Sequence, residues 1–171
     1  MFFQSLKKKS LKRNIHKLLQ SGEGPTSSSQ LKTAGILVDH TAFKDVSALK
    51  QMLQDISSGL NYEVLIYVKS LKEEETLVGD KFSEKSVSNT GKIKDPVVKS
   101  FIEKPFDFLV SYYSTENLPL QLITASSAAK FKVGLPTDID VNDLVLNVVV
   151  GDLSTFKSEL LKYLKILNRI D

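Results

Sequence analysis

The chain has 171 residues, of which 42% are hydrophobic and 25% are charged, and this balance indicates one folded globular domain. It has no cysteine and only two histidines, which excludes disulfides and thiolate sites and leaves too few histidines for a multi-histidine metal centre. We therefore expect no metal and no other cofactor. No apolar run approaches the roughly 20 residues that span a bilayer, so we expect a cytoplasmic protein without a transmembrane segment.

The net charge of +3 is unevenly distributed along the chain. The first 22 residues contain no acid, whereas residues 23–171 contain 17 basic and 20 acidic residues. The six basic residues of the first segment are Lys7, Lys8, Lys9, Lys12, Arg13 and Lys17. A block of like charge at a terminus is typical of a tail that binds a partner.

Hydrophobic residues within this basic segment follow a helical period. Leu11, Ile15, Leu18 and Leu19 fall on one stripe, which predicts an amphipathic helix over residues 1–20. Residues 21–30 are rich in Gly, Pro and Ser, as flexible linkers are. The sequence therefore predicts a basic helical arm at 1–20, a flexible linker at 21–30 and a single α/β domain at 31–171.

Apolar runs and helical patterns alternate along the rest of the chain. We expect strands at 34–38, 62–68, 106–112, 131–133 and 144–150, with a candidate edge strand around 81–87. Helical spacing predicts helices at 43–56, 96–104, 118–129 and 153–170. This alternation predicts a three-layer α/β fold with an open, mostly parallel sheet of about five strands, flavodoxin-like or Rossmann-like in topology.

Sequence signatures of common catalytic and nucleotide-binding loops are absent. No G-x-G-x-x-G follows the first strand, and neither G-x-x-x-x-G-K-[ST] nor G-x-S-x-G occurs. The sequence therefore favours a non-catalytic binding or accessory protein.

Polar residues follow two of the expected strands. Asp39 and His40 end the first strand, and Ser111 and Tyr112 end the strand at 106–112. Ligands bind open α/β sheets at the carboxyl ends of their strands, so these residues predict a ligand cleft that could serve a small enzyme or ligand-binding domain. The alternative is that they cap the following helix and pack at the strand ends.

Several segments resemble an uncharacterised family of short Bacteroidota (flavobacterial) proteins with a domain of unknown function. The segments are SLKKKSLKRNIHKLL, GILVD at 35–39, FIEKPFDFLVSYY at 101–113, AKFKVG at 129–134 and ELLKYLKILNRI at 159–170. They span most of the chain and imply a stand-alone domain. FDFLVSYY and AKFKVG also resemble a strand, helix and strand in the N-terminal half of heptosyltransferase-type glycosyltransferases, which implies a fold and not an activity.

The basic arm leads to the main functional prediction. Its six cations predict contacts with phosphates of RNA, including that of the ribosome, through shape and charge and without base readout. An anionic membrane surface is the alternative partner, because Phe2 and Phe3 precede the basic stretch. Two further alternatives remain open: a solvated helix face, and a helix whose leucines dock on their own domain.

Overall fold

The computed structural model describes residues 1–22, 24–25, 30–72 and 76–170. Residues 23 and 26–29 of the predicted linker therefore lie outside the described residues. Among the described residues, no helix is both long and apolar enough to cross a membrane.

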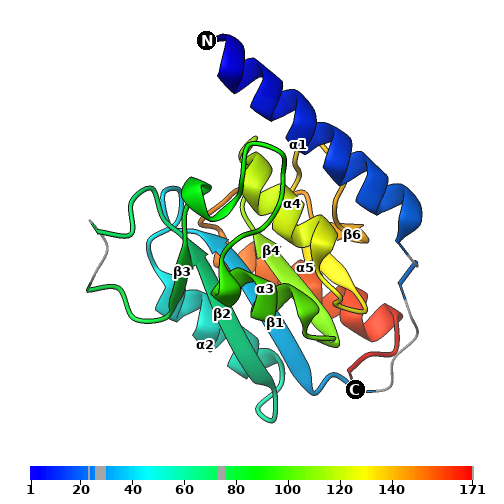
Figure 1. The fold of residues 1–171 in the computed structure, drawn as a ribbon. Helices are drawn as coiled ribbons and strands as arrows, with labels where there is room; N and C mark the ends of the chain where they lie inside the picture. The colour runs from blue at the N-terminus through cyan, green and yellow to red at the C-terminus, as the bar shows by residue number, and fades with distance from the viewer. Residues whose placement is uncertain (23, 26–29, 73–75, 171) are drawn as a thin grey trace.

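Six parallel strands form one sheet in the order β3-β2-β1-β4-β5-β6 (Figure 1). The strands are β1 (Thr33–Asp39), β2 (Asn61–Tyr67), β3 (Asp80–Phe82), β4 (Phe108–Tyr112), β5 (Lys132–Gly134) and β6 (Leu144–Val145). The predicted open parallel α/β sheet is confirmed, and its order is that of Rossmann folds. The first strand, β1, lies at the centre of the sheet, where it pairs with β2 on one side and with β4 on the other.

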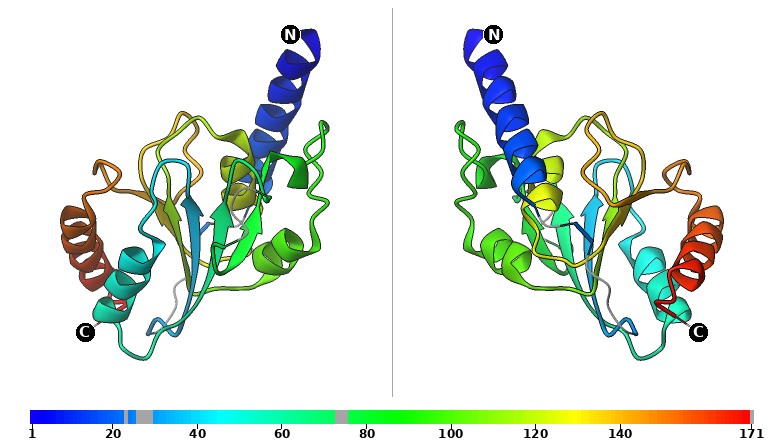
Figure 2. Two further views of the ribbon diagram at one scale, coloured as in Figure 1. Left: turned by 90° about the vertical axis from the view of Figure 1, so that its left-hand side faces the viewer. Right: turned by 90° about the vertical axis from the view of Figure 1, so that its right-hand side faces the viewer.

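Helices cover both faces of the sheet (Figure 2). On one face lie α2 (Val46–Ile56) and α5 (Leu153–Ile166), and on the other lie α3 (Pro96–Glu103) and α4 (Leu118–Ser126). A short 3-10 helix, η1 (Glu84–Ser86), follows β3. Because β1 is covered on both faces, its side chains from Ala34 to Asp39 are all buried, as its continuous apolar run predicts.

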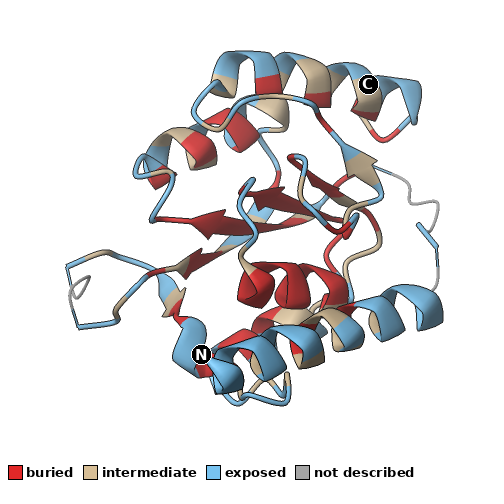
Figure 3. Cartoon of the chain, turned by 90° about the horizontal axis from the view of Figure 1, so that it is seen from above, coloured by how far each residue is buried: buried red, intermediate tan, exposed pale blue. Residues whose placement is uncertain are grey.

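The N-terminal helix α1 (Phe2–Ser21) adds a further layer outside α4 (Figures 1 and 3). Leu11 and Ile15 are buried there among Leu118, Leu122 and Ala125 of α4. The first turns of α1 project beyond the body of the protein, whereas its second half packs on it (Figure 2). Of the alternatives that the sequence left open for the arm, docking on its own domain is the one observed.

The composition of α4 explains why α1 is needed as a cover. All of its residues from Leu118 to Ala125 are buried, and apolar side chains occur around its whole circumference. A helix that is apolar on every side must be covered on every side. The sheet covers one side of α4 and α1 covers the other, so α4 occupies a central layer (Figure 3).

Two expected elements at the C-terminal end are shorter in the structure. The strand expected at 144–150 is reduced to Leu144–Val145, because its partner β5 ends at Gly134 and Pro136 soon follows without an N–H to donate. The helix expected at 153–170 ends at Ile166. Ile166 and Leu167 are exposed by 63% and 46%, so the buried stripe of α5 is Phe156, Leu160 and Leu164.

A buried carboxylate joins the amino ends of β1 and β4. Asp107 accepts hydrogen bonds from the backbone N–H groups of Lys32 and Thr33, each at 2.9 Å, and from Lys130 Nζ at 2.8 Å. Burial opposes its ionised form, but these donors outweigh that effect and lower the pKa of Asp107 to about 2. This carboxylate is therefore ionised at neutral pH and holds the start of the first strand in place.

Candidate functional site

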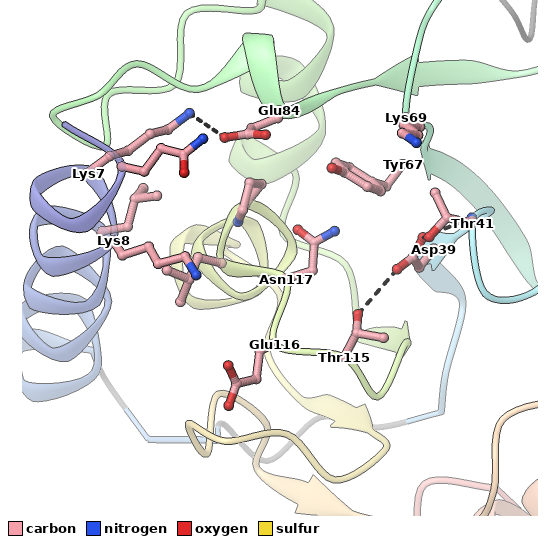
Figure 4. A pocket seen from close by; sticks show the side chains of 14 residues that line it. Lys7, Lys8, Asp39, Thr41, Tyr67, Lys69, Glu84, Thr115, Glu116 and Asn117 are labelled. Atoms are coloured by element: carbon pink, nitrogen blue, oxygen red, sulfur yellow. Dashed lines mark hydrogen bonds and ion pairs between the residues drawn. The ribbon is translucent and has the colours of Figure 1, made fainter. Parts of the chain in front are cut away.

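A cavity of about 560 Å³ lies outside the carboxyl ends of the central strands, between them and α1 (Figure 4). From β1 the chain passes to α2 on one face of the sheet, and from β4 it passes to α4 on the other face. Such a reversal is a topological switch point, where open α/β sheets bind their ligands. The polar lining comes from α1, from the ends of β1 and β2, from η1 and from the loop before α4. Its residues are Gln4, Lys7, Lys8, Asp39, Thr41, Tyr67, Lys69, Glu84, Thr115, Glu116 and Asn117.

Asp39 joins the two sides of the switch point. Its carboxylate accepts hydrogen bonds from the backbone N–H of Thr41 at 2.9 Å and from the Thr41 hydroxyl at 2.6 Å. Its second oxygen accepts a hydrogen bond from the Thr115 hydroxyl at 3.3 Å. Asp39 is only 2% exposed, so these bonds fix the loop after β4 against the end of β1 and leave the carboxylate well satisfied.

Tyr67 and Asn117 form a second polar contact at the cavity. Burial raises the pKa of the Tyr67 hydroxyl despite a hydrogen bond with the Asn117 side chain, so Tyr67 is neutral at pH 7. The Asn117 side chain also accepts a hydrogen bond from the N–H of Leu120 at 3.2 Å and thereby caps α4. Because the cap is filled and Pro119 has no N–H, the start of α4 offers few free donors to a ligand.

The lysines of the cavity differ in their partners. Lys7 forms an ion pair with Glu84 at 2.7 Å. Lys8 and Lys69 form no ion pair with any described residue. Lys8 points from α1 into the cavity, and Lys69 stands on the opposite wall beside Tyr67 (Figure 4). The cavity therefore holds two lysines, from two different elements, that form no ion pair with a described residue, and its lining also includes the carboxylates of Asp39 and Glu116.

Of the four residues predicted to line a cleft, the structure places Asp39 at this cavity. His40 is buried, with its Nδ1 3.4 Å from Lys44 Nζ. Ser111 is fully buried beneath α4, where its hydroxyl lies 3.1 Å from that of Thr124. Tyr112 faces the other side of the sheet and accepts a hydrogen bond from the Gly151 N–H at 3.0 Å. Neighbouring residues of a strand point to opposite faces, so one cleft could not include both Ser111 and Tyr112.

The six arm cations also separate by helix face. Lys7 and Lys12 point to the body, where Lys12 pairs with Asp138 at 3.1 Å. Burial alone would raise the pKa of Asp138, but hydrogen bonds from Gln121 and Lys12 lower it. Lys9, Arg13 and Lys17, the outer cations, are exposed and form no ion pair with a described residue. Spaced four residues apart, they form one positive line along the solvent face of α1.

Residues 7–167 match a family of unknown function, DUF6913. The chain belongs to this family. The match includes the docked part of α1 together with the sheet, the outer cations and every residue of the cavity lining except Gln4, whereas residues 1–6 lie outside it. No curated protein and no solved structure matches the chain.

Several residues at the cavity were absent from the sequence-based site, among them Lys69, Asn117 and Thr115. Lys69 follows β2 as Asp39 ends β1, so its position after a strand was the available signal. Asn117 precedes the Leu-Pro pair that opens α4, and this pattern marks a helix cap. Thr115 becomes significant only through its bond to Asp39, 76 residues away, and no local pattern indicates that contact.

Proposed function

We propose that this protein is a non-catalytic RNA-binding protein and that the outer cations of α1 hold RNA phosphates, including those of ribosomal RNA. The observation that carries the proposal is the line of Lys9, Arg13 and Lys17, exposed and without acidic partners among the described residues. All three also lie within the range that matches the family.

Docking makes α1 a better phosphate-binding surface than a free arm would be. A short free helix is only marginally stable in water, and ordering it on binding costs free energy. Leu11 and Ile15 hold α1 against α4, and the helix is therefore already ordered when the protein folds. The free-energy cost of ordering it does not reduce the affinity for RNA. With a rise of 1.5 Å per residue, Lys9 and Lys17 lie about 12 Å apart along the axis, with Arg13 between them.

The geometry changes the expected number of phosphate contacts. The six arm cations would all be available on a free helix, but Lys7 and Lys12 are engaged by Glu84 and Asp138, and Lys8 points into the cavity. With three outer cations, affinity for single-stranded RNA should fall with a log–log salt slope of roughly −2, at about −0.7 per contact. Nothing in the line reads base edges, so binding should be nearly independent of sequence.

A second candidate rests on the exposed tip of α1. Phe2 and Phe3 are 75% and 83% exposed, and Leu6 is 48% exposed. Apolar side chains beside cations are typical of helices that bind anionic membrane surfaces. This tip lies outside the range that matches the family, which favours RNA as the partner of the outer cations.

Fluorescence anisotropy with a labelled single-stranded RNA, measured from 50 to 300 mM salt, tests the proposal. A triple variant Lys9→Gln, Arg13→Gln, Lys17→Gln should lose most of the salt-dependent affinity. The matched control removes the same charge elsewhere with Lys32→Gln, Lys99→Gln and Lys165→Gln, three exposed lysines on other surfaces, and should bind like the wild type. Equal loss in both variants would mean that net charge alone drives binding and would refute the proposed surface.

Vesicles containing phosphatidylserine separate the two candidates. For RNA binding, Phe2→Ser with Phe3→Ser should leave the salt-dependent affinity unchanged. If the wild type binds vesicles but not RNA, and the double variant no longer binds vesicles, the membrane proposal replaces the RNA proposal.

A further inference from the structure

We propose that the cavity at the switch point binds a small phosphomonoester, such as a sugar phosphate or a nucleoside monophosphate. This site differs from the RNA surface, because the cavity lies on the inner side of α1 and the outer cations lie on the solvent side.

The location is the first argument. The cavity lies where the chain leaves β1 toward one face of the sheet and β4 toward the other, and this crevice is the general ligand position in open parallel sheets. Its volume of about 560 Å³ falls in the range of roughly 300–1,000 Å³ that small-molecule sites occupy. The space therefore suits a ligand of the size of a mononucleotide or a sugar phosphate.

The two lysines without ion pairs are the second argument. Three charged groups already have partners: Lys7 is paired with Glu84, and the Asp39 carboxylate, which keeps its negative charge, accepts hydrogen bonds from the N–H and hydroxyl of Thr41 and from the Thr115 hydroxyl. Lys8 and Lys69 remain without ion pairs among the described residues, and the other acids of the lining are Asp39, which is 2% exposed, and the exposed Glu116. A phosphomonoester carries close to two negative charges at neutral pH and would give both lysines a charge-assisted hydrogen-bond partner.

The remaining lining suits the organic part of such a ligand. Thr41, Tyr67 and Asn117 offer hydroxyl and amide groups to sugar hydroxyls. Leu11, Leu118 and Pro119 supply an apolar wall. Small-molecule sites usually combine a partly apolar cavity with a few polar groups that point into it.

The cations of this site come from Lys8 and Lys69 and not from the start of α4. Asn117 already accepts from the Leu120 N–H, and Pro119 has none to give. The affinity should therefore depend on the two lysines. Because Lys8 belongs to α1 and Lys69 follows β2, a bound phosphate would also join α1 to the sheet and should raise the melting temperature.

Lys8 and Lys9 provide a closely matched pair of variants. They are neighbours in sequence, both are exposed lysines without ion pairs among the described residues, and both are replaced by Gln with the same loss of charge. Lys8 lines the cavity, whereas Lys9 belongs to the outer cations. Neither side chain is buried, so both variants should fold.

Isothermal titration of the full chain with AMP and with ribose 5-phosphate tests the proposal, with adenosine, ribose and inorganic phosphate as comparison probes. We expect the phosphorylated compounds to bind and their dephosphorylated forms not to bind. Lys8→Gln and Lys69→Gln should each weaken that binding about tenfold, the loss of one charge-assisted contact, while Lys9→Gln leaves it unchanged.

The proposal is overturned if neither phosphorylated compound at 10 mM gives heat or a rise in melting temperature. Equal binding of adenosine and AMP, or an equal loss of affinity in Lys8→Gln and Lys9→Gln, would overturn it as well. Binding of inorganic phosphate as tight as that of both esters would also overturn it, because the organic part would then have no site. RNA affinity is expected to respond to Lys9→Gln and not to Lys8→Gln. Failure of the cavity site and failure of the RNA surface can therefore be distinguished.

Discussion

Replacing Ile15 by alanine tests whether α1 belongs to the folded core. Ile15 is fully buried between α1 and α4, where it packs with Leu118 and Leu122. Truncating a buried isoleucine to alanine costs roughly 2–5 kcal/mol, because transfer free energy is lost and a cavity remains. Since small domains have a total stability of about 5–15 kcal/mol, Ile15→Ala should lower the melting temperature and the urea midpoint clearly.

The loss has an upper limit that the structure also sets. Once α1 detaches, further changes on its inner face cost nothing more, because the helix no longer makes those contacts. Leu11→Ala, Ile15→Ala and their combination should therefore be less than additive, and the combination should approach the stability of a chain lacking residues 1–20. That chain would expose Leu118 and Leu122 of α4 and should bind a hydrophobic dye such as ANS.

Urea unfolding followed by circular dichroism gives the free energies, with Leu19→Ala as the matched control. Leu19 belongs to the same helix but is 37% exposed and lies outside the cluster around α4, so its truncation should cost less than about 0.5 kcal/mol. If Ile15→Ala, or the chain without residues 1–20, has the same free energy of unfolding as the wild type, the docked arrangement is refuted. The N-terminal helix would then be the independent arm that the Gly/Pro/Ser segment suggested.

Three further predictions concern the body of the protein. The pKa of Asp107 lies near 2, below the unfolded value of 3.8, so its stabilisation is complete above about pH 4 and is lost as the pH falls toward 2. Asp107→Asn should cost on the order of 1–2 kcal/mol at pH 7 and little at pH 2, and a pH-independent loss in urea titrations would contradict this origin. In α5, Leu164→Ala should lower the free energy of unfolding by about 2–5 kcal/mol because Leu164 is fully buried. Ile166→Ala should lower it by less than about 0.5 kcal/mol because Ile166 is 63% exposed. Similar melting temperatures of the two variants would contradict the assignment of Leu164 to the core and Ile166 to the surface. Gly134→Ala should destabilise the sheet by about 1–3 kcal/mol, because its Cβ would lie 2.7 Å from a β4 carbonyl oxygen, whereas Gly59→Ala meets nothing within 4 Å and should be tolerated in the same thermal assay.

The layers of the fold could be predicted because each strand and helix has its own local period. The apolar run at 34–38 identifies buried β1, and the helical spacing at 153–170 identifies α5, without reference to partners, although Ile166 and Leu167 of that spacing are exposed. The extent of β6 could not be predicted in this way, because a strand is only as long as the neighbour with which it pairs. Val148 and Val150 are apolar, as strand residues often are, but β5 ends at Gly134 and gives them no strand with which to pair.

The position of α1 was indicated by α4 more than by α1 itself. The positive charge of residues 1–20 and the Gly/Pro/Ser segment that follows them suggested an arm independent of the domain. Both features are local to the N-terminal part of the chain and carry no information about α4. The apolar residues on every side of 118–125 required a second cover for that helix. Reading the two helices together would have matched the stripe of Leu11 and Ile15 with the uncovered face of α4.

The two charge environments on α1 have the same origin. Once Leu11 and Ile15 are known to face the body, helical geometry places Lys7 and Lys8 one turn before Leu11 on that inner side, and Lys9 and Arg13 on the other. The sequence therefore contains the division between inner and outer cations. It does not contain the partners, because Glu84 and Asp138 are 77 and 126 residues from the lysines that they bind. Tertiary structure thus decides which cations are neutralised, and with that, which of them remain available to a phosphate in the cavity or in solution.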